Sequence, residues 1–161
     1  MPNWIEGTLK LRGKPENVMR FFREGVDASS LGFLGNGKDD PESMVKEEKL
    51  EDGEYYFKFS HEPWVKGTRR AFITEEWTVW VSEDEDYVVV PVAIKQAWAF
   101  VTENWQEIAK QYKLDIRLQG FECGMQFAQD LIIKSDGTVE KDDEIHYDNW
   151  DWDCPMPNMG G

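Results

Sequence analysis

The first element that the hydrophobic pattern predicts is a half-buried strand over residues 4–12. Apolar and polar side chains alternate there with a period of two, which is typical of a strand with one face on a core. Gly13 ends this strand, and Pro15 suits the first turn of a helix that stops near Gly25. The apolar residues of the helix recur at helical spacing: Val18, Met19, Phe21, Phe22 and Val26.

Residues 27–70 are predicted to be an insertion. Gly, Ser, Asp and Pro dominate residues 27–43, which is the composition of a loop. Further on, Asp52-Gly53 stands between two β-prone runs and predicts a hairpin. The expected elements are hairpin strands over 44–50 and 54–60, a loop over 61–70 and, after the insertion, a strand over 71–81.

The largest continuous apolar surface is predicted between Val88 and Asp136. A long amphipathic helix is expected to begin near Pro91 and to run to about Lys113, because apolar residues recur there at i, i+3 and i+4. These residues are Ala93, Ala97, Phe100, Val101, Trp105, Ile108 and Ala109. Two strands are expected to follow, over 114–122 and 125–134, joined by a turn at Cys123-Gly124.

The order of these elements predicts an α+β fold. It fits a mostly antiparallel sheet with two helices on one face. A ferredoxin-like sandwich with a βαββαβ core and an extra hairpin is the simplest version. A single domain is expected over 1–139, followed by an acidic aromatic tail over 140–161. Pro, Met, Asn and Gly dominate the end of this tail, which is therefore expected to be disordered.

The charge of the chain limits its partners. The 161 residues carry 32 acidic and 18 basic side chains, for a net charge of −14. Such a surface repels nucleic-acid backbones and anionic membranes, and it attracts a basic protein surface. The alternative interpretation is that the acidic residues serve only solubility.

Acidic and aromatic residues alternate in the tail. Aromatic anchors rimmed by charge are typical of protein interfaces. One hypothesis is that this segment docks into the basic groove of another protein, with carboxylates in place of phosphates. The other is that Trp150 and Trp152 fix the tail to its own sheet. The expected partner-binding residues are Asp142, Asp143, Glu144, Tyr147, Asp148, Trp150, Asp151, Trp152 and Asp153.

A basic loop gives a rival hypothesis. It predicts a module that binds single-stranded nucleic acid or a small molecule on the sheet face by charge and stacking. The expected contacts are Trp64, Lys66, Arg69, Arg70 and Trp80. Three cations against a net charge of −14 make direct nucleic-acid binding the weaker expectation.

Catalytic and metal-binding signals are sparse. Neither His61 nor His146 has a neighbour at a spacing that supplies a general base with an orienting group. Cys123 lies beside Glu122, whose charge disfavours a reactive thiolate, and its spacing from Cys154 is not that of metal ligands. We therefore expect no catalytic residue, cofactor or metal. A metal-dependent enzyme centred on His61 or the acidic tail is the third hypothesis.

Two stretches resemble a known family. The MPNW start, with its strand, Gly and Pro-Glu helix start, and the segment FECGMQFAQDLIIKSDG resemble the small YubB-type proteins of phages and plasmids. The resemblance covers residues 1–26 and 71–139 and departs from the family pattern at Ile5, where Cys is expected, and at Gly7, where Asn is usual. It implies a mobile-element protein with a ferredoxin-like domain and no catalytic residues to carry over.

Charge, sparse catalytic signals and the resemblance together predict a non-catalytic interaction protein of a phage or plasmid. Its expected partner has a basic surface, such as a nucleic-acid-binding defence complex that it inhibits in the manner of an anti-CRISPR or anti-restriction protein. We expect it in the bacterial cytoplasm, because the N-terminus lacks a signal-peptide pattern and the longest uncharged apolar run, 87–94, cannot span a bilayer.

Overall fold

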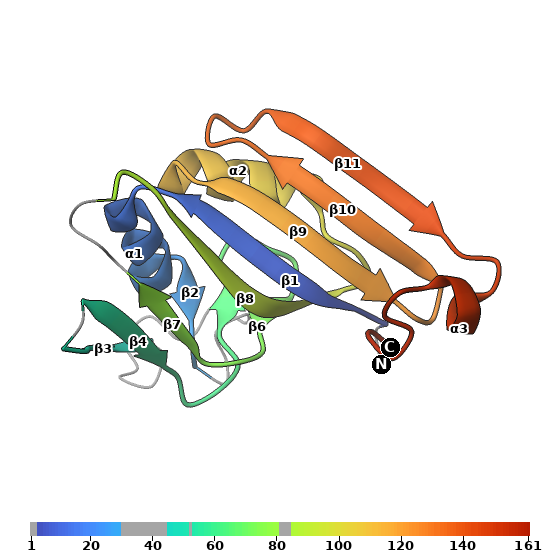
Figure 1. Cartoon of the computed structure of the whole chain (residues 1–161), viewed down its shortest axis with the longest axis horizontal. Helices are drawn as coiled ribbons and strands as arrows, with labels where there is room; N and C mark the ends of the chain where they lie inside the picture. Colours follow the sequence, from blue (N-terminus) through green and yellow to red (C-terminus); the bar gives the residue numbers. More distant parts are fainter. Residues whose placement is uncertain (1–2, 30–44, 52, 81–84) are drawn as a thin grey trace.

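The computed structural model describes residues 3–29, 45–51, 53–80 and 85–161. It confirms an α+β fold whose sheets are antiparallel throughout the pairings of the described residues (Figure 1). The larger sheet has eight strands in the order β11-β10-β9-β1-β8-β6-β5-β2, and the smaller has the order β3-β4-β7. The strands are β1 (Trp4–Gly13), β2 (Val26–Asp27), β3 (Lys46–Lys49), β4 (Glu54–Lys58), β5 (Trp64–Val65), β6 (Ala71–Ile73), β7 (Trp77–Trp80), β8 (Val88–Ala97), β9 (Asp115–Glu122), β10 (Phe127–Ile133) and β11 (Val139–His146). The helices are α1 (Pro15–Glu24), α2 (Thr102–Tyr112) and α3 (Trp150–Asp153).

Strand β1 lies in the middle of the large sheet. It pairs with β8 on one side and with β9 on the other, in each case over most of its length. Its side chains alternate between buried and partly exposed, as the sequence pattern predicts. Ile5, Leu9 and Leu11 are fully buried, and the residues between them lie on the opposite face.

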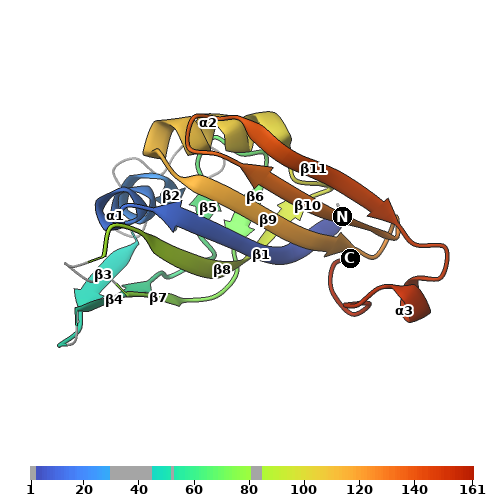
Figure 2. The ribbon, with the colours of Figure 1, turned by 45° about the horizontal axis from the view of Figure 1, so that its top comes forward.

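Helices α1 and α2 cover the same face of the large sheet, as the second view shows most clearly (Figure 2). The ring of Phe21 in α1 contacts the ring of Tyr112 in α2 edge-on, with 5.4 Å between centroids. On its other side α1 packs on the small sheet, where the rings of Phe22 and Phe57 lie 5.1 Å apart. Helix α1 therefore packs against both sheets, and β7 of the small sheet also contacts β8 of the large one.

The other side of the large sheet, which we call the open face, carries neither α1 nor α2. It consists of the even-numbered residues of β1 and β10, the odd-numbered residues of β8 and β9, and residues 141, 143 and 145 of β11. Many of these side chains are charged, because they are not packed under a helix. Any ligand of the sheet surface would meet this face.

The predicted helix start near Pro91 is wrong, since residues 88–97 form strand β8. Their burial alternates with a period of two, and Pro91 lies on the exposed side opposite Lys10. Strand β6 pairs only with Ile94, Lys95 and Gln96, so Pro91 lies where β8 pairs with β1 alone. A proline is tolerated there because it lacks only the N–H of an unpaired edge. The helix begins eleven residues later, at Thr102.

The predicted acidic tail is also wrong as a description of structure. Residues 139–146 form strand β11, which pairs along β10, and α3 follows. The end of the chain is not disordered: backbone hydrogen bonds join Trp4 and Gly161 in both directions, at 3.2 and 3.1 Å. The N–H of Gly160 also donates to Glu6 Oε2 at 3.3 Å. The two termini therefore lie side by side (Figure 1).

The predicted insertion contains regular structure. The two strands of the expected hairpin are present as β3 and β4. The expected loop over 61–70 includes β5, and the expected strand over 71–81 divides into β6 of the large sheet and β7 of the small one. The loop predicted over residues 27–43 lies mostly outside the described residues.

A close approach of backbones fixes the register between β1 and β9. Gly7 and Gly120 are direct cross-strand partners. A Cβ atom on Gly7 would lie 1.9 Å from the carbonyl oxygen of Gln119, so this position holds only glycine. Gly7 is also one of the two positions at which the sequence departs from the YubB-type pattern, which usually has Asn there.

We predict that Gly7→Ala lowers the free energy of unfolding by at least about 3 kcal/mol, because the backbone oxygen cannot move without breaking the ladder. Urea unfolding followed by circular dichroism measures the change. Thr8→Ala, on the open face of the same strand, is the control and is expected to cost no more than about 1 kcal/mol. Equal losses in the two variants would contradict the close-approach account.

Candidate functional site

The residues predicted to bind a partner lie at one corner of the molecule. We call residues 139–153, which comprise β11, α3 and the turn between them, the acidic corner. Within the described residues no strand pairs with the outer side of β11. Its acidic residues are exposed and include Glu140, Asp142, Asp143, Glu144, Asp148, Asp151 and Asp153. One edge of the sheet is therefore strongly negative.

Several of these carboxylates have internal partners. Asp142 accepts hydrogen bonds from Thr102 Oγ1 at 2.7 Å and from Gln129 Nε2 at 3.3 Å, which ties β11 to the start of α2. Glu144 Oε1 lies 2.6 Å from His146 Nε2. The side chains of Asp148, Asp151 and Asp153, in and beside α3, are exposed and have no hydrogen bond or ion pair within the described part of the chain.

The two tryptophans of the corner have different roles. Trp150 is 4% exposed, and its Nε1 donates to the carbonyl of Pro157 at 2.8 Å. Its ring also meets Tyr147 edge-on, and burial raises the pKa of that tyrosine. Trp152 is 84% exposed. Trp150 therefore joins α3 to the segment around Pro157 and to Tyr147, whereas the side chain of Trp152 is exposed to solvent.

Other apolar side chains are exposed at the same end of the sheet. Met125 in the β9–β10 turn is 65% exposed, Ile145 at the end of β11 is 48% exposed, and Met156 after α3 is 47% exposed. A backbone hydrogen bond from Tyr147 to Gln126 joins the turn to the acidic corner. The corner thus combines carboxylates with several solvated apolar groups.

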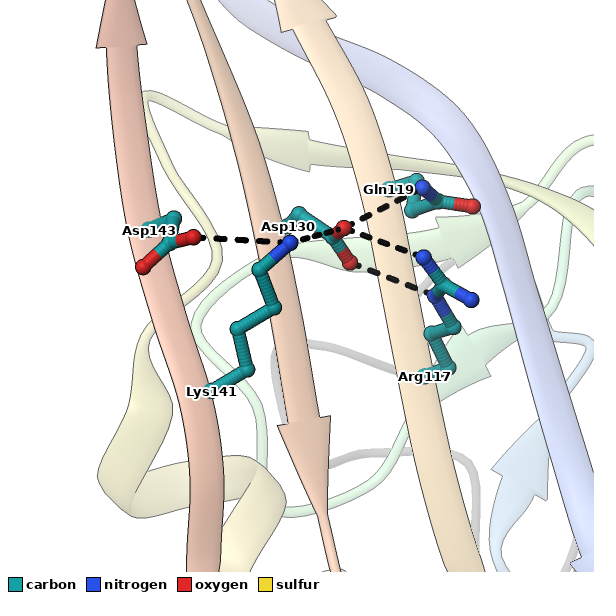
Figure 3. Close-up of polar contacts among 5 residues, drawn as sticks. All are labelled: Arg117, Gln119, Asp130, Lys141 and Asp143. Carbon is teal, nitrogen blue, oxygen red and sulfur yellow. Dashed lines mark hydrogen bonds and ion pairs between the residues drawn. The ribbon is translucent and has the colours of Figure 1, made fainter.

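A second polar arrangement, centred on Asp130, spans three strands of the open face (Figure 3). Arg117 donates to both of its oxygens, through Nε at 3.2 Å and Nη2 at 3.0 Å. Lys141 Nζ lies 2.8 Å from Asp130 Oδ2 and 3.4 Å from Asp143 Oδ2, and Gln119 Nε2 donates to Asp130 Oδ2 at 3.3 Å.

Burial alone would raise the pKa of Asp130, because its side chain is only 14% exposed. The hydrogen bonds from Arg117 and Lys141 outweigh that effect, and the pKa lies below its ordinary value. The hydrogen bond from Lys141 to Asp130 likewise raises the pKa of the lysine. The network is therefore ionised at neutral pH and holds Arg117 in a fixed orientation.

The network centred on Asp130 was not predicted from the sequence. The alternation of Arg117 and Gln119 along a predicted strand does mark one face of that strand. The partnership with Asp130 depends on the register between β9 and β10, which the local pattern does not contain. Lys141 was placed in a tail, so its contact with a neighbouring strand was not foreseeable.

The structure commits most of the predicted nucleic-acid contacts to internal partners. Trp64 Nε1 donates to the carbonyl of Thr68 at 3.2 Å, and Lys66 Nζ donates to the carbonyl of Glu24 at 2.9 Å. The guanidinium of Arg70 lies 5.3 Å from the ring centroid of Trp4, which weakens the case for free stacking at this loop. Arg69 is exposed, and the side chain of Trp80 lies outside the described residues.

The remaining candidates are scattered. His61 Nδ1 lies 3.2 Å from Ser60 Oγ, whereas His146 belongs to the acidic corner. Cys123 and Cys154 are free thiols, and Cys154 is buried. In the described ranges no group of three or more His, Cys, Asp or Glu side chains is placed to hold a metal ion.

No family model, curated protein or solved structure matches this chain. Among the described helices, none has both the length and the apolar composition needed to cross a membrane. The candidate site must therefore be interpreted from its own residues.

We predict that Asp130→Asn lowers the free energy of unfolding by about 1 to 2 kcal/mol at neutral pH, because two cations lose a shared anionic partner. The folded-state pKa of Asp130 is depressed, so its stabilisation is present above the carboxyl pKa of the unfolded chain, about 3.9, and is lost as the pH falls through the lower folded value. Urea unfolding should show that the difference in free energy of unfolding between the parent and the variant becomes smaller below about pH 4. A stability difference that stays constant as the pH falls below about 4 would contradict an ionised Asp130.

We also predict that Trp150→Ala releases the C-terminal segment and Trp152→Ala does not. Hydrogen exchange at the amide of Gly161, which donates to Trp4, reports the release directly. Exchange should become faster in Trp150→Ala only. The stability of Trp152→Ala should stay within about 0.5 kcal/mol of the parent. Faster exchange in Trp152→Ala would show that its ring holds the segment.

Proposed function

We propose that this protein is a non-catalytic acidic interaction protein and that its acidic corner binds a basic surface on another protein. The observation that carries the proposal is the position of Trp152, a large apolar side chain that is 84% exposed among carboxylates. Exposed aromatic groups with a charged rim are the usual anchors of protein interfaces. The net charge of −14 would speed the encounter with a cationic partner.

Edge protection alone accounts for part of this corner. Charged residues on an outer strand discourage pairing with other chains, and β11 carries such residues. That role requires no exposed tryptophan. The corner also exposes apolar side chains, those of Trp152, Met125 and Met156. Exposed apolar surface promotes association, so edge protection does not explain it. A partner that covers these side chains accounts for both features together.

The finer proposal concerns the partner and the origin of the protein. A protein that normally binds nucleic acid has a basic groove, and carboxylates along β11 and α3 would occupy it in place of phosphates. An inhibitor of a host defence complex, made by a phage or plasmid, fits this chemistry, and the resemblance to YubB-type proteins supports that origin. The strand order β9-β1-β8-β6, with α1 after β1 and α2 after β8, supports the ferredoxin-like arrangement proposed with it.

The test compares two variants that each remove three negative charges. In the first, Asp148, Asp151 and Asp153 of the acidic corner are changed to Asn. In the matched control, the exposed residues Glu51, Glu85 and Asp86 are changed to the corresponding amides. Each protein is immobilised, lysate of the native host is passed over it at low and high salt, and captured proteins are identified and then purified for affinity measurement.

We predict that one basic protein is captured by the parent and the control variant, and that the first variant binds it at least about tenfold more weakly. Binding should weaken as salt rises, because exposed charges are screened. The purified partner should also lose its own nucleic acid when this protein is added. Equal weakening in both variants, or binding that salt does not affect, would contradict the proposal.

A further inference from the structure

We propose that the open face also carries a binding site for a small phosphomonoester. The site is a hollow of about 280 Å³ at the end of the sheet away from α3 and Trp152. It lies over the end of β1, the start of β9 and the end of β10. Its lining residues are Lys10, Arg12, Val89, Asp115, Ile116, Arg117, Ile132, Lys134 and Glu140.

The charge of the hollow is opposite to that of the protein. Four cationic side chains line it with two carboxylates, and Asp130 already balances the charge of Arg117. One positive charge is therefore left in excess, on a chain whose total is −14. A phosphomonoester carries a charge between about −1.5 and −2 at neutral pH and accepts several hydrogen bonds. The hollow therefore attracts such an anion by its cationic excess, and the side chains of Val89 and Ile132 offer apolar surface to the rest of the molecule.

Lys10 is the side chain most directly available to a ligand. It lies directly across the strands from Arg117, and like charges in that position destabilise a sheet. Within the described residues Lys10 has no ion pair, hydrogen bond or aromatic partner. Arg117 is already held by Asp130, as Figure 3 shows. A bound anion between the two side chains would relieve their repulsion.

The other cations are held in position. Arg12 donates through Nε to Asp115 Oδ2 at 3.0 Å, and the same carboxylate accepts from the backbone N–H of Ser135 at 2.9 Å. Lys134 Nζ lies 3.2 Å from Glu140 Oε2. Arg12 and Arg117 each use Nε and Nη2 in these pairs, which leaves Nη1 for a ligand. Preorganised donors of this kind lower the entropic cost of binding.

The size of the hollow favours a small molecule over a nucleic-acid strand. About 280 Å³ is at the lower end of small-molecule sites and suits a sugar phosphate or a nucleoside monophosphate. A longer strand that continued across the open face would approach the carboxylates of Asp143 and Glu6, which repel it. The proposal does not depend on Trp152 or on the carboxylates in and beside α3, which lie at the other end of the sheet. Glu140, at the start of β11, is the residue that the hollow shares with the acidic corner.

The experiment is a titration of the ¹⁵N-labelled full chain, followed by amide chemical shifts. The probes are ribose 5-phosphate and adenosine monophosphate, with inorganic phosphate, uncharged ribose and a single-stranded oligonucleotide for comparison. Lys10→Glu tests the site. Lys46→Glu is the matched control, because Lys46 also faces a lysine, Lys58, across a strand pair, but in the small sheet.

We expect both phosphomonoesters, and not ribose, to shift amides of β1, β9 and β10 around the hollow. Lys10→Glu should weaken their affinity by about tenfold or more, because a charge-assisted contact is replaced by repulsion. The same change should raise the melting temperature of the unliganded protein, since an acid then faces Arg117. Lys46→Glu should leave the affinity unchanged, which separates loss of the site from a general change of charge.

Four results would overturn the proposal. The first is the absence of shifts with either ester at about 10 mM, which is weaker than ordinary millimolar binding. The second is equal binding of inorganic phosphate, which would indicate a general anion patch. The third is tighter binding of the oligonucleotide than of the monophosphate. The fourth is unchanged ester affinity in Lys10→Glu.

Discussion

The pairing of β1 with β8 and β9 determines which side chains of the large sheet are buried and which reach solvent. Its odd-numbered residues form the centre of the surface that α1 and α2 cover, and its even-numbered residues lie on the open face. The contact between Gly7 and Gly120 fixes the register with β9. A shift of one residue would move Lys10 and Arg12 into the core and bring apolar side chains into solvent. Stability and surface chemistry are therefore set by the same ladder.

Charge is divided between two ends of this one sheet. The acidic corner carries exposed carboxylates around Trp152, and the hollow around Lys10 carries a cationic excess. Between them the Asp130 network is internally balanced in charge, and its central carboxylate is shielded from solvent. A strongly acidic protein can thus present one surface to a basic macromolecule and another to a small anion. The proposed functions differ in partner, in site and in the sign of the charge that attracts the ligand.

The sequence predicted the parts of the fold that local patterns determine. The alternation in β1 and the proline start and glycine end of α1 were sufficient to place those elements. Prediction from the sequence failed for elements whose conformation depends on contacts between residues far apart in the chain. Pro91 was taken as a helix start, because the pairing that leaves one side of β8 free there is invisible locally. The charged residues of β11 were predicted to be a tail, because their pairing with β10 cannot be seen in the local sequence. The cross-strand neighbours of Lys10 likewise follow from register.

Site-specific photo-crosslinking in cells of the native host can show whether a partner binds the acidic corner. A benzophenone amino acid replaces Trp152 in one protein and Tyr87, which is 64% exposed at the other end of the sheet, in a second. We predict that position 152 crosslinks to a single protein with a basic surface and that position 87 does not. Crosslinking of that same protein at position 87 with equal yield, or no crosslink at position 152, would contradict it.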